Sequence, residues 1–72
     1  EGQGLRVNYR RAVHWYRLAA KGGDMMAQWN LAMCYRDGDG VRSSSRWCKY
    51  WLKAAAAQGH RKARQRLKEW FG

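Results

Sequence analysis

Apolar and small residues recur along this chain with the spacing of helices that bury one face. In the stretch 9–21 they fall at positions i, i+4, i+7 and i+8, which lie on one side of an α-helix. The spacing returns three more times and predicts helices over 9–21, 25–36, 45–57 and 60–71. The residues expected to face inward are Ala12, Tyr16, Ala19 and Ala20 with Trp15 at the margin, then Ala27, Leu31, Cys34 and Tyr35, then Cys48, Leu52, Ala55 and Ala56 flanked by Trp47 and Trp51, and finally Ala63, Leu67, Trp70 and Phe71.

Glycines and helix-capping residues separate these segments. Gly22-Gly23 and Gly59 follow the first and third helices, where a glycine adopts the left-handed conformation that ends a helix. Asn8, Asp24 and Ser44 stand just before three of the helices, as residues whose side chains accept hydrogen bonds from the first turn. Short connections of this kind place consecutive helices antiparallel, as helical hairpins.

The two halves of the chain repeat each other at an offset of 36 residues. The shift aligns ten identical pairs: Gly2 with Gly38, Gly4 with Gly40, Arg6 with Arg42, Arg10 with Arg46, Trp15 with Trp51, Ala19 with Ala55, Ala20 with Ala56, Gly23 with Gly59, Ala27 with Ala63 and Leu31 with Leu67. A fixed period of this size is the signature of stacked supersecondary units. The sequence therefore predicts an all-α fold, a fragment of an α/α solenoid in right-handed superhelical order. Its four antiparallel helices form two helix-turn-helix repeats, 1–36 and 37–72, within a longer array.

The repeated motifs resemble the Sel1-like repeat family, relatives of the tetratricopeptide repeats. The resemblance rests on the Gly-x-Gly-Val loop at 38–41 and on Ala12-x-x-Trp15-Tyr16-x-x-Ala19-Ala20, Gly23-Asp24, Ala27-Gln28-x-Asn30-Leu31, Cys34-Tyr35-x-Asp37-Gly38, Trp51-Leu52-x-x-Ala55-Ala56-x-Gln58-Gly59-His60 and Ala63-x-x-x-Leu67. It implies a scaffold or adaptor that binds other proteins, an expectation that the fold alone does not fix. The chain departs from the family pattern at Ser45, at Cys48 and in its strongly basic last helix.

The net charge of the chain indicates which kinds of partner it attracts. The 72 residues carry a net charge of +10, and the segment 41–68 contains nine Lys or Arg and no acidic residue. Such a field attracts acidic proteins, and it equally favours nucleic acid or another anionic surface, which is the competing interpretation. No apolar run approaches the roughly 18 residues that span a membrane. The chain begins with Glu1, which indicates a piece of a longer protein or a processed one.

The residues that carry catalysis or bind metals do not form a recognisable motif here. Cys34, Cys48 and the two histidines lack zinc-site spacing, and free cysteines on an apolar face usually act as small hydrophobes. Asp37 and Asp39 begin like a calcium loop, but its later ligands are absent. No nucleophile is paired with an acid or base by spacing. We therefore expect no enzyme activity, no metal and no cofactor.

Basic residues form a stripe on the first helix of each repeat, and this stripe is the predicted binding site. In the first helix the stripe residues follow one another at i, i+4, i+7 and i+11, opposite the alanine-rich face. The hypothesis is a concave basic groove that binds an acidic peptide, made of Arg10, His14, Arg17, Lys21, Arg46, Lys49, Tyr50 and Lys53. The simpler alternative is a solvated charged face.

Several aromatic residues also suggest contacts. Trp29 and Trp47 do not follow the repeat, and they are expected either to cover a repeat edge or to make an exposed contact. Two repeats leave both ends of the stack without a neighbour. We expect Trp70 and Phe71 to cover the last end, or the uncapped ends to pair with another copy of the chain.

Overall fold

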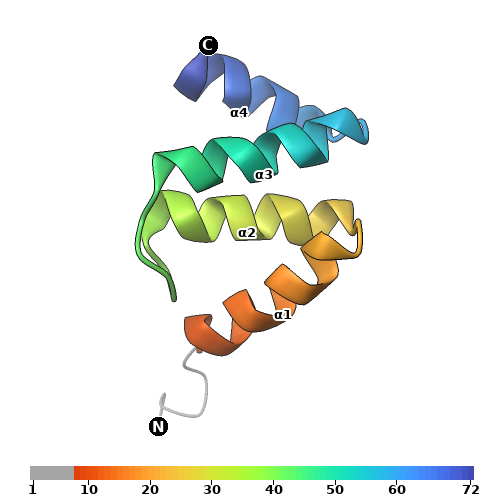
Figure 1. Ribbon diagram of the computed structural model, residues 1–72. Coiled ribbons are helices and arrows are strands. Elements are labelled where there is room, and N and C mark those ends of the chain that lie inside the picture. Colours follow the sequence, from red (N-terminus) through yellow and green to blue (C-terminus); the bar gives the residue numbers. More distant parts are fainter. Residues whose placement is uncertain (1–7) are drawn as a thin grey trace, which may run out of the picture.

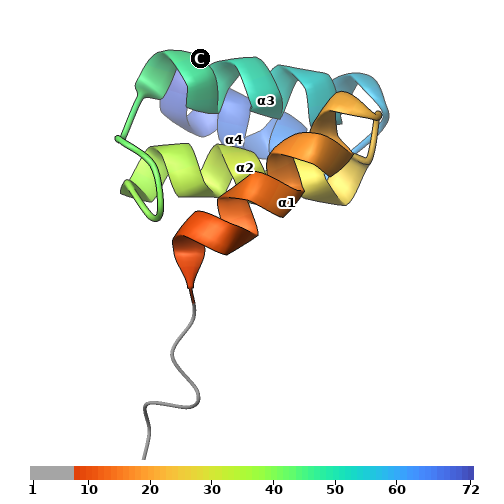
Figure 2. The ribbon, with the colours of Figure 1, turned by 60° about the horizontal axis from the view of Figure 1, so that its bottom comes forward.

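The structure, a computed structural model, describes residues 8–72 as four α-helices. These are α1 (Tyr9–Lys21), α2 (Met25–Asp37), α3 (Ser45–Ala57) and α4 (Arg61–Phe71). They stack in chain order as antiparallel neighbours, so that α1 and α4 lie at opposite ends of the stack (Figure 1). In a turned view α1 crosses obliquely in front of α2, and α4 lies at the back of the stack (Figure 2). The described residues contain no strand, and the predicted all-α helical-hairpin fold is confirmed.

Each helix begins at a capped residue, and the caps follow the 36-residue period. The side chains of Asn8 and Ser44 accept hydrogen bonds from backbone amides three residues later, at 3.1 and 3.2 Å. Asp24 and His60 do the same for the second helix of each hairpin, at 2.9 and 3.0 Å. Such a bond satisfies one of the amides that a helix start leaves without a partner. Because His60 is the cap, α4 begins at Arg61, one residue after the predicted start.

The core lies where the helices face their neighbours. Leu31 and Leu52 are fully buried at the contact between α2 and α3, with small residues around them that let the helix axes approach. One polar side chain joins this core. The amide of Gln28 donates to the carbonyl of Ala20 at 3.1 Å and accepts from Gln58 at 2.9 Å, so the buried polar group is satisfied. Gln58 also donates to the carbonyl of Gly23 at 2.8 Å, which links the turns of the two hairpins.

On the three later helices the residues predicted to face inward are buried or half-buried, except that Trp47 is 45% exposed, and the prediction for α1 needs correction. There Val13 is buried in place of Ala12, which is half-buried with Tyr16 and Ala19. Trp15, expected at the margin of the buried face, is 65% exposed. The physical reason is that α1 is an end helix that packs mainly against α2, so only one edge of its surface is covered.

The loop between α2 and α3 packs against the start of α1. Gly38 and Gly40 have φ angles of 75° and 76°, the left-handed region that favours glycine. A side chain added at Gly40 would overlap the backbone carbonyl of Tyr9 and would lie 2.9 Å from the amide nitrogen of Arg10. The loop can approach α1 this closely only with glycine at that position. The aligned Gly4 lies outside the described residues.

Candidate interaction groove

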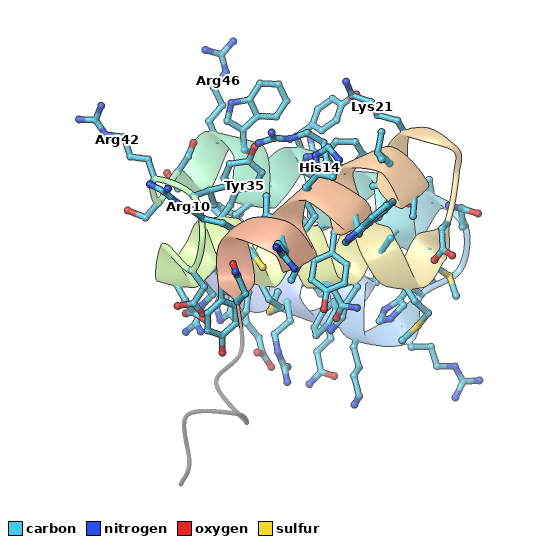
Figure 3. The ribbon with its side chains drawn as sticks, turned by 90° about the horizontal axis from the view of Figure 1, so that it is seen from below. Arg10, His14, Lys21, Tyr35, Arg42 and Arg46 are labelled. Atoms are coloured by element: carbon cyan, nitrogen blue, oxygen red, sulfur yellow. The ribbon has the colours of Figure 1, made fainter. Side chains whose placement is uncertain are left out.

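A row of basic residues follows one exposed side of α1. Arg10, His14, Arg17 and Lys21 are all exposed, as the helical spacing requires. Figure 3 shows Arg10, His14 and Lys21 on the same side of the molecule as Arg42 and Arg46, which come from the loop and from α3. Cations from three segments of the chain therefore gather on one surface.

Two adjoining hollows lie between α1, the loop and α3. The first has a volume of about 490 Å³ and the second about 370 Å³, and Arg17, Tyr35 and Trp47 line both. We call the combined surface the basic-aromatic groove. Its residues are Arg17, Lys21, Tyr35, Val41, Arg42, Ser43, Ser44, Trp47 and Trp51.

Stacked aromatic rings form a continuous row in and beside the groove. The ring of Tyr35 stacks on Trp47 with 6.2 Å between centroids. Trp47 meets Tyr50 edge-on at 5.3 Å, and Tyr50 meets Trp51 at 4.9 Å. Such pairs hold one another in fixed orientations. Trp47 and Tyr50 remain 45% and 55% exposed, so this row presents rigid apolar surface to a partner.

Arg17 is held in position by a hydrogen bond to Tyr35, which also lines the groove. Its guanidinium donates to the hydroxyl of Tyr35 at 3.0 Å. A guanidinium has five N–H donors, and this single bond leaves most of them free for a carboxylate. The bond joins α1 to α2 and directs the positive charge of Arg17 towards the aromatic row.

Carboxylates are absent from the lining of the groove. Within residues 8–72 the ion pairs are Arg36 with Asp37 at 3.4 Å and Arg66 with Glu69 at 3.1 Å, and none of these residues lines the groove. Among residues 8–72, the groove cations therefore have no carboxylate partner.

The eight residues predicted as a binding site do not all lie in this groove. Arg17 and Lys21 line it, and Tyr50 and Arg46 belong to the same face of α3, where Tyr50 packs between Trp47 and Trp51. The remaining four do not line the groove. Arg10 and His14 line a separate shallow hollow beside Trp15, Lys49 lies with its ammonium 5.9 Å from the ring of Phe71 towards α4, and Lys53 is exposed on α3.

Seven groove residues were not among the eight predicted: Tyr35, Val41, Arg42, Ser43, Ser44, Trp47 and Trp51. Tyr35 was assigned to the core, yet it is half-buried with its hydroxyl facing Arg17. Arg42 and Trp51 come from the loop and from a helix position assigned to packing. One sequence signal was available, because Arg42 is identical to Arg6 at the 36-residue offset.

The other residues singled out from the sequence have packing roles. Trp29 stacks on His60 with 4.9 Å between ring centroids, so it covers the edge between α2 and the start of α4. The accepting Nδ1 of His60 carries no proton, because it bonds the amide of Ala63. In the part of the chain that the structure describes, no three His, Cys, Asp or Glu side chains cluster in a way that would hold a metal ion.

Both cysteines are free and buried. Burial raises the pKa of the Cys34 thiol, and Asp39 and Asp37 raise it further. Burial also raises the pKa of Cys48, partly offset by Arg36. Both groups therefore stay protonated near neutral pH, which suits packing and disfavours nucleophilic chemistry.

The raised thiol pKa values predict a loss of stability in alkaline solution. Above about pH 8.5, the usual pKa of a free thiol, the unfolded chain releases protons that the folded chain still holds. The stabilising contribution is complete below that pH and is lost as the pH rises through the higher folded-state values. Urea unfolding at pH 7 and at about pH 9.5 measures it. We expect a smaller alkaline loss in the double variant C34A/C48A; equal losses would contradict the assignment.

Comparison with known proteins gives a family and two relatives. The family profile described as Sel1 repeat matches residues 1–24 and 26–60. The chain is 36% identical over 65 residues to DAP3-binding cell death enhancer 1 of Mus musculus, and 32% identical over 65 residues to the protein of that name from Rattus norvegicus. Each alignment covers 90% of this chain and 13% of the relative, so the chain spans about an eighth of the length of either.

No solved structure gave a significant match. Among the described residues, no helix is both long and apolar enough to cross a membrane.

Proposed function

The chain belongs to the Sel1 repeat family, as its motifs predict, and from this premise we propose that it is a non-catalytic module that binds an acidic segment of another protein in the basic-aromatic groove. Sel1 repeats generally mediate protein–protein interaction. The observation that carries the proposal is the groove itself, in which cations that have no carboxylate partner among residues 8–72 lie beside the exposed ring of Trp47.

The charge of the groove favours an acidic partner. Arg17 lines both hollows, Arg42 lines the first and Lys21 the second, and the segment 41–68 adds no acidic residue that would compete. Complementary charge accelerates encounter and selects among partners, while contributing less to final affinity. Charge therefore supplies selection for acidic chains.

The aromatic row favours a protein partner over a bare polyanion. Exposed Trp and Tyr side chains are the residues that most often dominate the binding energy of protein interfaces. Trp47 and Tyr50 are exposed yet held by their neighbours, so little conformational freedom is lost when they are covered. We propose that an apolar side chain of the partner packs on Trp47 while flanking carboxylates bind Arg17 and Arg42.

The names of the two relatives also support a protein partner, less strongly than the groove does. The printed name of the mouse and rat proteins describes them as binding DAP3. The similarity covers a small share of those proteins, so it supports the class of partner and leaves its identity open.

Two charge-reversal variants test the groove. The probe is a fluorescent peptide of about 12 residues, rich in Asp and Glu around one Leu, measured by anisotropy. Arg17→Glu with Lys21→Glu should weaken its binding about tenfold or more, because attraction in the groove becomes repulsion. The matched control, Arg61→Glu with Lys62→Glu, makes the same change in net charge on α4 and should alter the dissociation constant less than about threefold. Equal losses in both variants would contradict the proposal.

A salt series distinguishes the alternative class of partner. A nucleic-acid binder releases counterions in proportion to the phosphates it contacts, so its affinity falls steeply with salt. If a single-stranded oligonucleotide binds more tightly than the peptide at about 0.15 M salt, and both variants weaken it alike, the surface is a nucleic-acid interface and the proposed function is wrong.

A further inference from the structure

The two ends of the helix stack have different chemistry. α1 lies at one end and packs mainly on α2, whereas α4 lies at the other end and packs mainly on α3 (Figure 1). The inner helices each have two helical neighbours. Because the two halves repeat at 36 residues, an inner position shows how the aligned end position would be buried if a further hairpin were present.

Trp15 and Trp51 give the clearest comparison. They are aligned by the repeat, but Trp15 is 65% exposed and Trp51 is 9% exposed. Their local surroundings are alike, since His14 meets Trp15 edge-on at 5.4 Å and Tyr50 meets Trp51 edge-on at 4.9 Å. The two tryptophans differ in what precedes their helices. The hairpin of α1 and α2 precedes α3, whereas no hairpin precedes α1 among the described residues. Leu18, close to Trp15 on the helix, is also 53% exposed.

α4 exposes charged residues at positions where the aligned helix α2 buries uncharged ones. Gln28 and Ala32 are 6% and 0% exposed in α2, which lies between α1 and α3. The aligned residues in α4 are Arg64 and Lys68, both exposed. Burying two cations under another hairpin without carboxylate partners is strongly unfavourable. The large exposed hydrophobic residues of the described chain lie on α1, α2 and α3, and none lies on α4.

We propose that the outer face of α1 binds a further helical hairpin of the same repeat type, whereas the outer face of α4 does not. The occupant is defined by the covered inner interface: its second helix presents small uncharged residues, as α2 presents Gln28 and Ala32 to the hairpin that follows it. A second copy of this chain does not fit through its own α4, because Arg64 and Lys68 would be buried in the contact. The stack therefore extends in one direction. This interface is separate from the basic-aromatic groove.

A fusion protein tests the accepting face. Residues 1–36 are placed directly before residues 1–72, which keeps the 36-residue period of the sequence across the junction. The melting temperature should rise by at least about 5 °C. The indole N–H of the inner Trp15 should become protected from a soluble paramagnetic probe in NMR spectra, to the level of Trp51. An inner Trp15 that stays as accessible as in the single chain would overturn the proposal.

A second fusion tests the outer face of α4, which we propose does not bind a further hairpin. A variant of this fusion tests whether Arg64 and Lys68 are the reason. Residues 37–72 are appended after residue 72, and this addition should leave the melting temperature within about 2 °C of the parent. Replacing the inner cations, Arg64→Gln with Lys68→Ala, copies the residues of α2 and should now give a rise similar to that of the first fusion. If the unmodified second fusion is stabilised as much as the first, the ends are equivalent and the directional stack is wrong.

Discussion

The substitution Gly40→Ala should lower the free energy of unfolding by about 3 kcal/mol or more. Two effects add at this position. The φ angle of 76° is unfavourable for alanine, and the new methyl group would meet the backbone of Tyr9 and Arg10 in the first turn of α1. Backbone atoms in a helix cannot move aside as a side chain tip can, so either the loop or α1 must shift. Urea unfolding followed by circular dichroism measures the loss.

Gly59→Ala is the matched control for this prediction. Gly59 has a φ angle of 97°, but nothing lies within 4 Å of the position that a side chain would take. Only the conformational strain remains, which amounts to about 1–2 kcal/mol. If the two variants lose the same stability, close packing of the loop against α1 contributes nothing measurable.

The double variant Trp70→Ser with Phe71→Ser should lose about 3–5 kcal/mol, enough to unfold a chain of this size at moderate temperature. Both rings are half-buried against the core. The guanidinium of Arg36 lies 4.2 Å from the centre of a Trp70 ring, and Lys49 lies over Phe71 at 5.9 Å, so cation–π contacts are lost as well.

Trp47→Ser serves as the control for ring size, because this tryptophan is 45% exposed on the groove side. It should lower the melting temperature much less than the double variant does. An unchanged melting temperature in the double variant would show that the last turn of α4 is not needed for the fold.

Helix positions could be predicted from sequence because their determinants are local. Asn8, Asp24 and Ser44 cap helices through amides three residues away, and Gly23 and Gly59 take positive φ at aligned turns. Burial depends on neighbours distant in the chain. Gln28 is buried because Ala20 and Gln58 bond its amide, and nothing near it in the sequence indicates those partners.

The candidate site was predictable in part for the same reason. Helical spacing places Arg17 and Lys21 on one edge of α1, and both line the groove. The contributions of Tyr35 and Arg42 depend on how α2 and the loop pack against α1, which periodicity within one helix does not reveal. Lys49 shares a helix with Trp47, yet its ammonium lies over Phe71 on the side of α4.

An NMR titration of the ¹⁵N-labelled chain with the acidic peptide tests the proposed groove most directly. We expect the largest chemical shift changes to cluster on Arg17, Lys21, Tyr35, Arg42 and the indole N–H of Trp47. These groups come from α1, α2, the loop and α3, so only a ligand in the groove contacts them together. Shift changes confined to residues 61–68 of α4 would place the peptide outside the basic-aromatic groove and show that the proposed binding site is wrong.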